Sequence, residues 1–192
     1  MHLIFSSCDF KNENSKKVIL ENLGMPIEEC RVLFVPNEKA SPQAIRGEKF
    51  YLRLESYGFK RENIIVLDYY RTENFTDLSI DAVYVSGGNT FGTMYRLKKH
   101  GFADRLIKYV KDGAVYIGGS AGAHIASANM EHVLRYDANS NGIEDMQGLG
   151  LFNGIFICHY TEEREEHFLK LKEEGKYPVY ALSNDDCIVI DI

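Results

Sequence analysis

Short apolar runs alternate with amphipathic stretches along the whole chain. The apolar runs, which we predict to be strands, are residues 2–5, 31–36, 63–68, 81–88, 114–119, 154–160, 177–182 and 187–192. The amphipathic stretches, which we predict to be helices, are residues 15–24, 41–59, 89–101, 102–113 and 161–175. Alternating strands and helices indicate βαβ units, and continuously apolar strands are expected where helices cover both faces of a parallel sheet. The pattern predicts a three-layer α/β/α fold with a mostly parallel sheet.

Local signals mark where some of these helices begin and end. Ser41 and Pro42 are of the types preferred at the N-cap and at the first helical position, and Gly58 is placed to end the same helix. Gly24 is placed in the same way at the end of the helix predicted over residues 15–24. The chain has no repeat and no linker-like segment, so we expect a single domain spanning residues 1–192.

Charge and composition exclude several classes of partner. The net charge is −6 and the pI about 5.5, without a basic stripe, so we expect no nucleic-acid partner. No run approaches the ~18 apolar residues of a membrane span, and the first residues lack a signal-peptide pattern. The four cysteines, at positions 8, 30, 158 and 187, have neither metal-binding nor disulfide-framework spacing. We therefore expect a cytoplasmic monomer or homodimer that uses no metal and no cofactor.

The most specific feature is the stretch YIGGSAGAHIAS at residues 116–127. Residues 118–122 form the pattern G-x-S-x-G between an apolar strand and a helix, with Ser120 in the middle. The glycines of this pattern let a strand turn sharply into a helix and expose the serine hydroxyl. The N–H of Ala121 and the helix N-terminus would face a carbonyl oxygen that becomes negative. We therefore predict that Ser120 is a nucleophile rather than an idle residue in a tight junction.

A second glycine turn, SGGNT at residues 86–90, also follows an apolar strand. Parallel pairing would bring this turn to the carboxyl edge of the sheet, where Ser120 lies and where open α/β sheets bind their ligands. The N–H of Gly88 is a second candidate oxyanion donor, and Asn89 beside it is a candidate substrate-binding residue. A phosphate-binding loop is not indicated, because neither GxGxxG nor GxxxxGK occurs.

Six histidines are candidates for the catalytic base. His159 ends the apolar run GIFICHY just before a predicted helix, which would place it at the same edge of the sheet as Ser120. A base must come within ~2.6–3.2 Å of the nucleophile, and His159 is best placed for this. The ring of His124 would point away from the serine, and His132 could be structural or functional. His2 is at the terminus, and we expect His100 and His167, which lie in polar helical settings, to be solvated.

A third residue should hold the imidazole in the correct tautomer, and a carboxylate commonly does this. Asp137 follows a short apolar patch and precedes turn residues, which suits a carboxylate at a strand end. The alternatives that remain open are Glu131, Glu144, Asp145, Asp185 and Asp186. Arg164, shortly after His159, is a candidate to bind a substrate carboxylate through two hydrogen bonds.

Together, SGGNTF, GGSAGA and a strand ending in CHY resemble the aspartyl dipeptidase (peptidase E) family of serine peptidases, which is related to cyanophycinase. The resemblance runs from about residue 30 to the end of the chain. It implies a flavodoxin-like, class I glutamine-amidotransferase-like fold. It also implies Ser120 as nucleophile, His159 as base and the backbone of Gly88 and Ala121 as oxyanion donors. The family's acid lies about 22 residues before its histidine, and Asp137 has that separation.

These features favour a metal-independent serine peptidase that hydrolyses short peptides, with dipeptides carrying an N-terminal aspartate among the candidate substrates. A serine esterase or amidase acting on a small non-peptide substrate shares the serine motif and the Ser–Asp–His order. The 17-residue interval between Ser120 and Asp137 counts against the α/β-hydrolase esterases, which usually have an extra strand and helix there. From a different class, a relative that binds a ligand without turnover is a further alternative.

Overall fold

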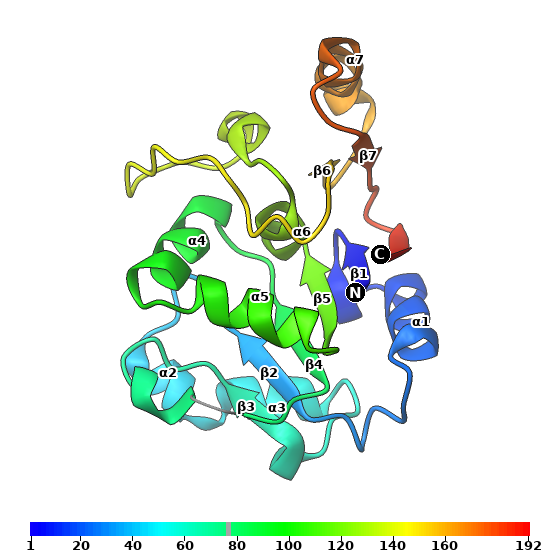
Figure 1. Cartoon of the computed structure of the whole chain (residues 1–192). Coiled ribbons are helices and arrows are strands. Elements are labelled where there is room, and N and C mark those ends of the chain that lie inside the picture. Colours follow the sequence, from blue (N-terminus) through cyan, green and yellow to red (C-terminus); the bar gives the residue numbers. More distant parts are fainter. Residues whose placement is uncertain (76–77) are drawn as a thin grey trace.

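The computed structural model describes residues 1–75 and 78–192, and its centre is a six-stranded sheet (Figure 1). The strands lie in the order β3-β2-β4-β5-β1-β8. All of them run parallel except β8, which is antiparallel to β1. Their bounds are β1 His2–Ser6, β2 Val32–Val35, β3 Ile64–Val66, β4 Ala82–Val85, β5 Val115–Gly119 and β8 Cys187–Asp191.

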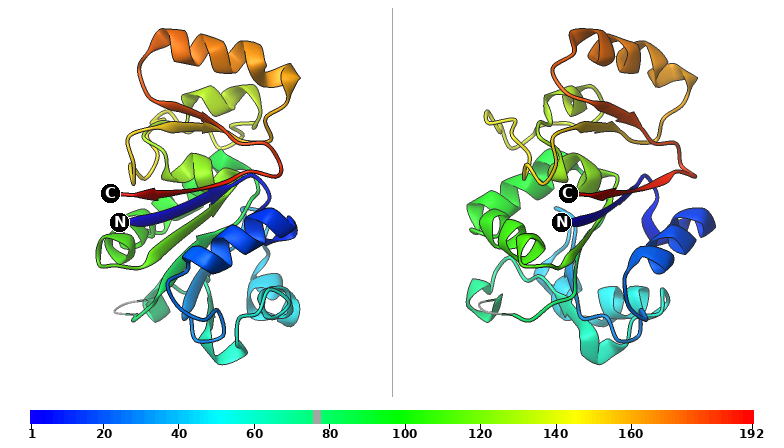
Figure 2. Two further views of the ribbon diagram at one scale, coloured as in Figure 1. Left: turned by 90° about the vertical axis from the view of Figure 1, so that its right-hand side faces the viewer. Right: turned by 45° about the vertical axis from the view of Figure 1, so that its right-hand side comes forward.

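Helices cover both faces of this sheet (Figure 2). The helices α4 (Thr90–Lys99) and α5 (Ala103–Lys111) lie on one face, and α1 (Glu13–Asn22), α2 (Pro42–Arg46) and α3 (Glu48–Glu55) lie on the other. Short 3-10 helices are η1 Asp9–Lys11, η2 Arg61–Asn63, η3 Thr72–Phe75, η4 Glu131–Arg135 and η5 Glu162–Arg164. The predicted three-layer α/β/α fold with a mostly parallel sheet is confirmed. No helix in the described residues is long and apolar enough to cross a bilayer.

The helix predicted over residues 41–59 forms as two helices. Its start is confirmed, because the Ser41 hydroxyl accepts a hydrogen bond from the N–H of Ala44 at 3.2 Å and Pro42 occupies the first turn. The chain then becomes extended at Gly47, which separates α2 from α3. A Cβ atom at position 47 would lie 2.8 Å from the Gln43 carbonyl oxygen, so the break depends on a glycine.

The strands predicted over residues 154–160 and 177–182 also form, but in a separate parallel sheet. They are β6 (Ile155–Ile157) and β7 (Val179–Ala181), joined by α7 (Glu165–Glu174). The helix α6 (Ala121–Ala126) contacts both β5 and β6, so it links the small sheet to the central one (Figure 1).

Aromatic side chains fill the space between the two sheets. The ring of Phe5 on β1 lies with its centroid 4.7 Å from that of Phe156 on β6 and 5.3 Å from that of Phe152. Tyr116 on β5 packs on the same ring of Phe5 at 5.9 Å. Aromatic pairs at these distances are stabilising beyond the area they bury, so the cluster fixes β6 relative to β1 and β5.

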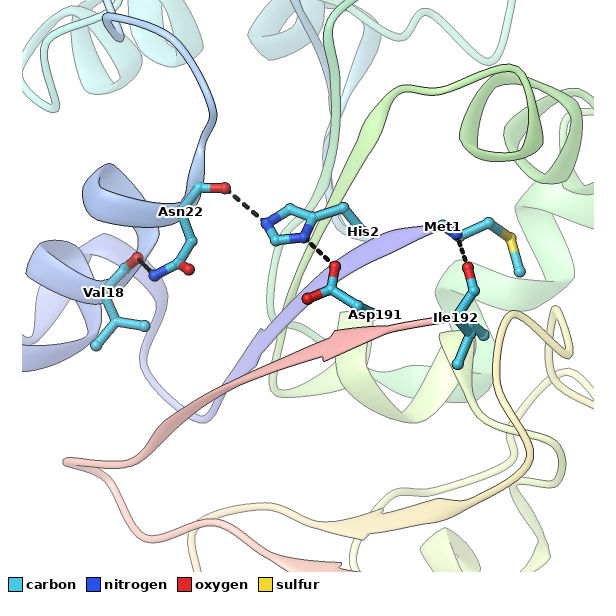
Figure 3. A network of polar contacts seen from close by, with 6 residues as sticks. All are labelled: Met1, His2, Val18, Asn22, Asp191 and Ile192. Carbon is cyan, nitrogen blue, oxygen red and sulfur yellow. Dashed lines mark hydrogen bonds and ion pairs between the residues drawn. The ribbon is translucent and has the colours of Figure 1, made fainter.

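The two ends of the chain lie side by side on β1 and β8 (Figure 3). His2 Nδ1 lies 2.5 Å from a carboxylate oxygen of Asp191, and His2 Nε2 lies 2.7 Å from the carbonyl oxygen of Asn22. The amino group of Met1 donates to the carbonyl oxygen of Ile192. These contacts tie the first strand to the last strand and to the end of α1.

Candidate active site

Ser120 occupies a sharp turn between β5 and α6, with φ 48° and ψ −106°. Positive φ is rare for residues other than glycine and is concentrated at functional sites. The turn requires its flanking glycines. A Cβ atom at Gly122 would lie 2.2 Å from the Val85 carbonyl oxygen, and one at Gly118 would lie 2.9 Å from the Gly122 carbonyl. The G-x-S-x-G pattern therefore reflects backbone packing that holds the serine at the carboxyl edge of the sheet.

His159 lies beside this serine, with its Nε2 atom 2.9 Å from Ser120 Oγ. Its φ is also positive, at 53°. The backbone holds it in place, since the His159 N–H donates to the Ser7 hydroxyl at 2.9 Å and that hydroxyl donates to the Leu182 carbonyl at 2.9 Å. The imidazole and the hydroxyl are thus within the distance that proton transfer requires.

The partner of the other ring nitrogen is an amide. His159 Nδ1 lies 2.7 Å from Asn184 Oδ1. An amide oxygen can only accept, so Nδ1 carries the proton and Nε2 presents its lone pair to the serine hydroxyl. Asn184 Oδ1 also accepts from the Cys8 thiol at 3.5 Å. The arrangement orients the imidazole as a carboxylate would, but without a negative charge.

Pairing between β6 and β7 brings Asn184 to His159. Ile157 pairs with Ala181, and beyond the strands the Tyr160 N–H still donates to the Leu182 carbonyl at 2.9 Å. Since the two strands are parallel, the residues that follow them leave the small sheet at the same edge.

Asp137, the predicted orienting acid, forms no hydrogen bond with His159 within the described residues. Its Oδ2 atom accepts a hydrogen bond from the N–H of Thr90 at 2.8 Å, at the start of α4. A helix N-terminus has free N–H groups and a partial positive charge, which attract a carboxylate. The other acids considered also have different surroundings: Asp145 pairs with Lys98, Asp185 accepts from Asn12, Asp186 accepts from the N–H of Ser183, and Glu131 and Glu144 are exposed.

The SGGNT turn lies against Ser120, which agrees with the prediction that both turns lie at the same edge of the sheet. A Cβ atom at Gly87 would lie 3.5 Å from Ser120 Cβ. Within the described residues, the N–H groups of Gly88 and Ala121 donate no hydrogen bond to the protein. Asn89 caps α4 instead of standing free, because Oδ1 accepts from the Gly92 N–H at 2.7 Å and Nδ2 donates to the Ala138 carbonyl at 3.0 Å.

Arg164 lies close to His159 but has contacts within the protein. Its guanidinium donates to the Cys158 carbonyl and lies 4.1 Å from the centroid of the Tyr136 ring. The Tyr136 hydroxyl lies 2.6 Å from Nδ1 of His167. The expectation that His167 is solvated is therefore wrong, because it is buried beneath Tyr136.

The other two histidines near the site are buried and structural. His124 Nδ1 lies 3.1 Å from the Thr90 hydroxyl, and burial holds the pKa of this histidine well below its usual range. His132 Nε2 donates to the Phe156 carbonyl at 2.7 Å, and burial lowers its pKa to about 4. Over residues 1–75 and 78–192, no group of three or more His, Cys, Asp or Glu side chains is arranged to hold a metal ion.

Comparison with known proteins places this geometry in a family. Residues 2–191 match peptidase family S51. The chain belongs to peptidase family S51. An uncharacterized peptidase of Listeria monocytogenes is 32% identical to this S51 peptidase over 174 residues, which cover 83% of this chain and 81% of that protein. Peptidase E of Streptomyces coelicolor is 32% identical over 114 residues, 53% of this chain and 45% of that one.

Solved structures agree with this assignment. A Listeria monocytogenes crystal structure provisionally named peptidase E superposes on the S51 peptidase with a TM-score of 0.75 and 26% identity, covering 98% of this chain and 93% of that one. A peptidase from an acI-B1 Actinobacterium, with a TM-score of 0.60 and 16% identity, shares the fold. The resemblance to the peptidase E family is confirmed, and the chain is a peptidase.

Two parts of the site of this S51 peptidase lie outside the predicted set. One is Asn184, in the polar stretch SNDD that follows β7. The other is the SSCD segment, residues 6–9, which follows β1 and supplies both Ser7 and Cys8 to the histidine and its partner. One sequence signal could have indicated both Asn184 and the SSCD segment. Each is a run of polar residues directly after an apolar strand, and such runs mark the sheet edge where ligands bind.

Proposed function

We propose that this S51 peptidase is a serine peptidase that cleaves short peptides with Ser120 as nucleophile, His159 as base and Asn184 as the residue that orients the base. The observation that carries the proposal is the 2.9 Å contact between Ser120 Oγ and His159 Nε2. The 2.7 Å contact of Nδ1 with Asn184 Oδ1 supports the tautomer that this role needs.

The first half of the reaction uses these groups in order. His159 Nε2 takes the hydroxyl proton as Ser120 Oγ attacks the scissile carbonyl, and the carbonyl oxygen becomes an oxyanion. The N–H groups of Gly88 and Ala121, which have no partner within the described residues, are the proposed donors to that oxygen. His159 then passes the proton to the leaving amine, which leaves an acyl group on the serine.

The second half regenerates the enzyme. His159 removes a proton from a water molecule, whose oxygen attacks the acyl carbon, and the serine oxygen leaves with the proton that Nε2 returns. Throughout, Asn184 Oδ1 accepts a hydrogen bond from the Nδ1–H of His159. The imidazolium that forms in each step faces the neutral dipole of this amide. A carboxylate, which carries a negative charge, would stabilise that cation more strongly.

For substrate preference, we propose that Arg164 attracts an acidic side chain at the first residue of a short peptide. Its guanidinium is half-buried and donates to the Cys158 carbonyl, directly before the catalytic histidine. Asn89 would contribute through its place beside Gly88 rather than through its side chain, which caps α4.

A dipeptide library with Asp, Glu or a neutral first residue tests both the proposed peptidase activity and the proposed preference for an acidic first residue. We expect hydrolysis by the wild type, loss of at least about 10⁴-fold in Ser120→Ala, and preference for an acidic first residue that Arg164→Gln removes. Faster turnover of p-nitrophenyl acetate than of any dipeptide would favour an esterase. Peptidase activity that survives in Ser120→Ala would refute the nucleophile assignment.

A fluorophosphonate probe separates a reactive site from an inert one. This probe reacts with an activated serine and needs no peptide. Labelling of Ser120 in the wild type, with none in His159→Ala, is the expected result. A wild type that no probe labels and that cleaves no peptide would support a relative that binds a ligand without turnover.

A further inference from the structure

Backbone strain points to a third residue at the active site. In residues 1–75 and 78–192, the residues other than glycine with positive φ are Asp9 at 54°, Ser120 at 48° and His159 at 53°. Two of these are the proposed nucleophile and base. Strained backbone clusters at functional sites, and aspartate tolerates this conformation better than most residues do, so strain alone does not assign a role to Asp9.

The side chain of Asp9 lies directly against the turn that carries the nucleophile. A Cβ atom built on Gly119 would lie 1.0 Å from Asp9 Oδ1 and 2.0 Å from its Cγ. The carboxyl group therefore occupies the space where a side chain of residue 119 would lie. Asp9 is only 3% exposed, and its Oδ1 atom has no hydrogen-bond partner among the described residues.

The same carboxyl group faces the SGGNT turn. A Cβ atom at Gly87 would lie 3.7 Å from the carbonyl oxygen of Gly119, the residue against which the Asp9 carboxyl group packs. Burial raises the pKa of Asp9 to about 6, and the neighbouring Tyr84 hydroxyl and Gly87 N–H act to lower it. Within the described residues, neither Tyr84 nor Gly87 forms a hydrogen bond of regular geometry with the Asp9 carboxyl group. Gly87 in turn lies against Ser120, as described above.

Charged and titratable groups surround Asp9 from every neighbouring element. They are Arg53 of α3, Lys11 of η1, Tyr84 of β4, Tyr116 of β5, Cys187 of β8, and Cys8 and Cys158 at the ends of β1 and β6. Arg53 and Lys11 act at a distance, because Asp9 forms no ion pair within the part of the chain that the structure describes. A residue retained only for folding would have its polar atoms satisfied, and Asp9 combines burial, strain and an unpaired oxygen.

We propose that Asp9 is a positioning residue of the active site, whose ionised carboxylate holds Gly87, and with it the proposed oxyanion donor Gly88, against the Ser120 turn. The proposal rests on the function proposed above. A carboxylate is a stronger acceptor for the Gly87 N–H than a protonated carboxyl group is, so protonation weakens the hold on the turn. Asp9 acts through the backbone and does not touch the substrate.

The test is the rate at which a fluorophosphonate probe labels Ser120, measured from about pH 5 to about pH 9. The variants are Asp9→Asn, which keeps an acceptor oxygen but cannot ionise, and Asp9→Ala, which has no acceptor. Asp68→Asn is the matched control, because Asp68 is also a buried aspartate but lies after the edge strand β3 and pairs with Arg46 of α2.

In the wild type, two groups must lose a proton, His159 and Asp9, so the acid limb should be steeper than a single protonation gives. Asp9→Asn should show a single-proton limb, and Asp9→Ala should label at least about tenfold more slowly at every pH, since a misplaced oxyanion donor costs at least this much. Asp68→Asn should follow the wild type. Asp9 variants that also follow the wild type would overturn the proposal.

The Gly87 amide resonance in NMR spectra gives a second readout, which needs no reactive serine. It should shift with a midpoint near pH 6 in the wild type and should not shift in Asp9→Asn. A Gly87 resonance that titrates identically in both proteins would refute the proposal, even if the probe labels Ser120. Failure of the probe to label the wild type would instead count against the proposed function.

Discussion

Asn184 places a neutral amide where the Ser–His–Asp hydrolases have a carboxylate. The amide fixes the tautomer of His159, because it can accept only from a protonated Nδ1. It provides no charge to favour the imidazolium. The base of this site should therefore be oriented as well as in a carboxylate triad, but its cationic form should be less stable.

Replacing Asn184 separates orientation from charge. Asn184→Asp should keep kcat/KM within about tenfold and move the acid limb of its pH profile upward, because a nearby negative charge raises the pKa of an imidazole. Asn184→Ala should lose about 100-fold, since the imidazole is no longer held. The pH dependence of kcat/KM for a cleaved dipeptide measures both. An acid limb that stays in place in Asn184→Asp would contradict this electrostatic account.

Asp137 should behave differently from Asn184, because it caps α4. Asp137→Ala removes the acceptor of the Thr90 N–H and should cost about 1 kcal/mol of unfolding free energy, or a Tm lower by about 2–4 °C. Its loss of kcat/KM should be smaller than that of Asn184→Ala. Thermal unfolding and kinetics of the two alanine variants, compared side by side, decide the matter. A larger kinetic loss in Asp137→Ala would restore Asp137 as the orienting residue.

Asp9 should also make the stability of the protein depend on pH. Its pKa is about 6 when folded, above the ~3.9 of an unfolded aspartate. The protonated form is therefore favoured by folding, and its contribution is complete below about pH 4 and is lost as the pH rises through about 6. The difference amounts to roughly 3 kcal/mol.

Relative to Asp9→Asn, the wild type should therefore lose unfolding free energy between about pH 4 and about pH 7. Urea unfolding of the two proteins at several pH values measures this difference. A constant difference across that range would show that the carboxyl group is not buried as described.

At the scale of elements, the proposed active site is built by three segments that follow β1, β4 and β5, together with the ends of β6 and β7. Parallel strands bring the first three to one edge, and the aromatic packing between Phe5 and Phe156 brings the small sheet to the same place. The contact between Asp9 and Gly119 joins the segments after β1 and at the end of β5.

The contact between Asp9 and Gly119 can be tested by adding a side chain at position 119 and removing the one at position 9. Gly119→Ala should be destabilised by about 1–3 kcal/mol, because its methyl group would overlap the Asp9 carboxyl group. Asp9→Gly in the same chain removes the overlap and suits a positive φ, so the double variant should regain at least about 1 kcal/mol. Urea unfolding of the four proteins gives the coupling. Additive effects would mean that the two residues do not touch.

The parts of the site that were predicted are those encoded locally. Ser120 lies in a pattern whose glycines are required by the turn itself, and His159 ends an apolar run at a strand edge. Asn184 depends on the pairing of β6 with β7 in a sheet of their own, which periodicity does not reveal. Asp9 depends on a positive φ and on the absence of a side chain at Gly119, and neither is visible in the residues around it.

At the scale of the whole molecule, the fold followed from the alternation of strands and helices, but the division into two sheets did not. The runs at residues 155–157 and 179–181 are as apolar as those of the central strands, so hydrophobicity alone could not assign them to another sheet. The break at Gly47 escaped prediction for a similar reason, because glycine within a helical pattern is often tolerated.

Because the first and last strands pair, residues 1 and 192 lie next to each other. Because Met1 and Ile192 touch, a few glycines could join them and turn β8 and β1 into an ordinary hairpin. New ends opened between the exposed residues Gly24 and Met25 would yield a circular permutant that begins ahead of β2 and finishes with α1. Such a protein should react with a fluorophosphonate as fast as the parent. A slower reaction would contradict this expectation.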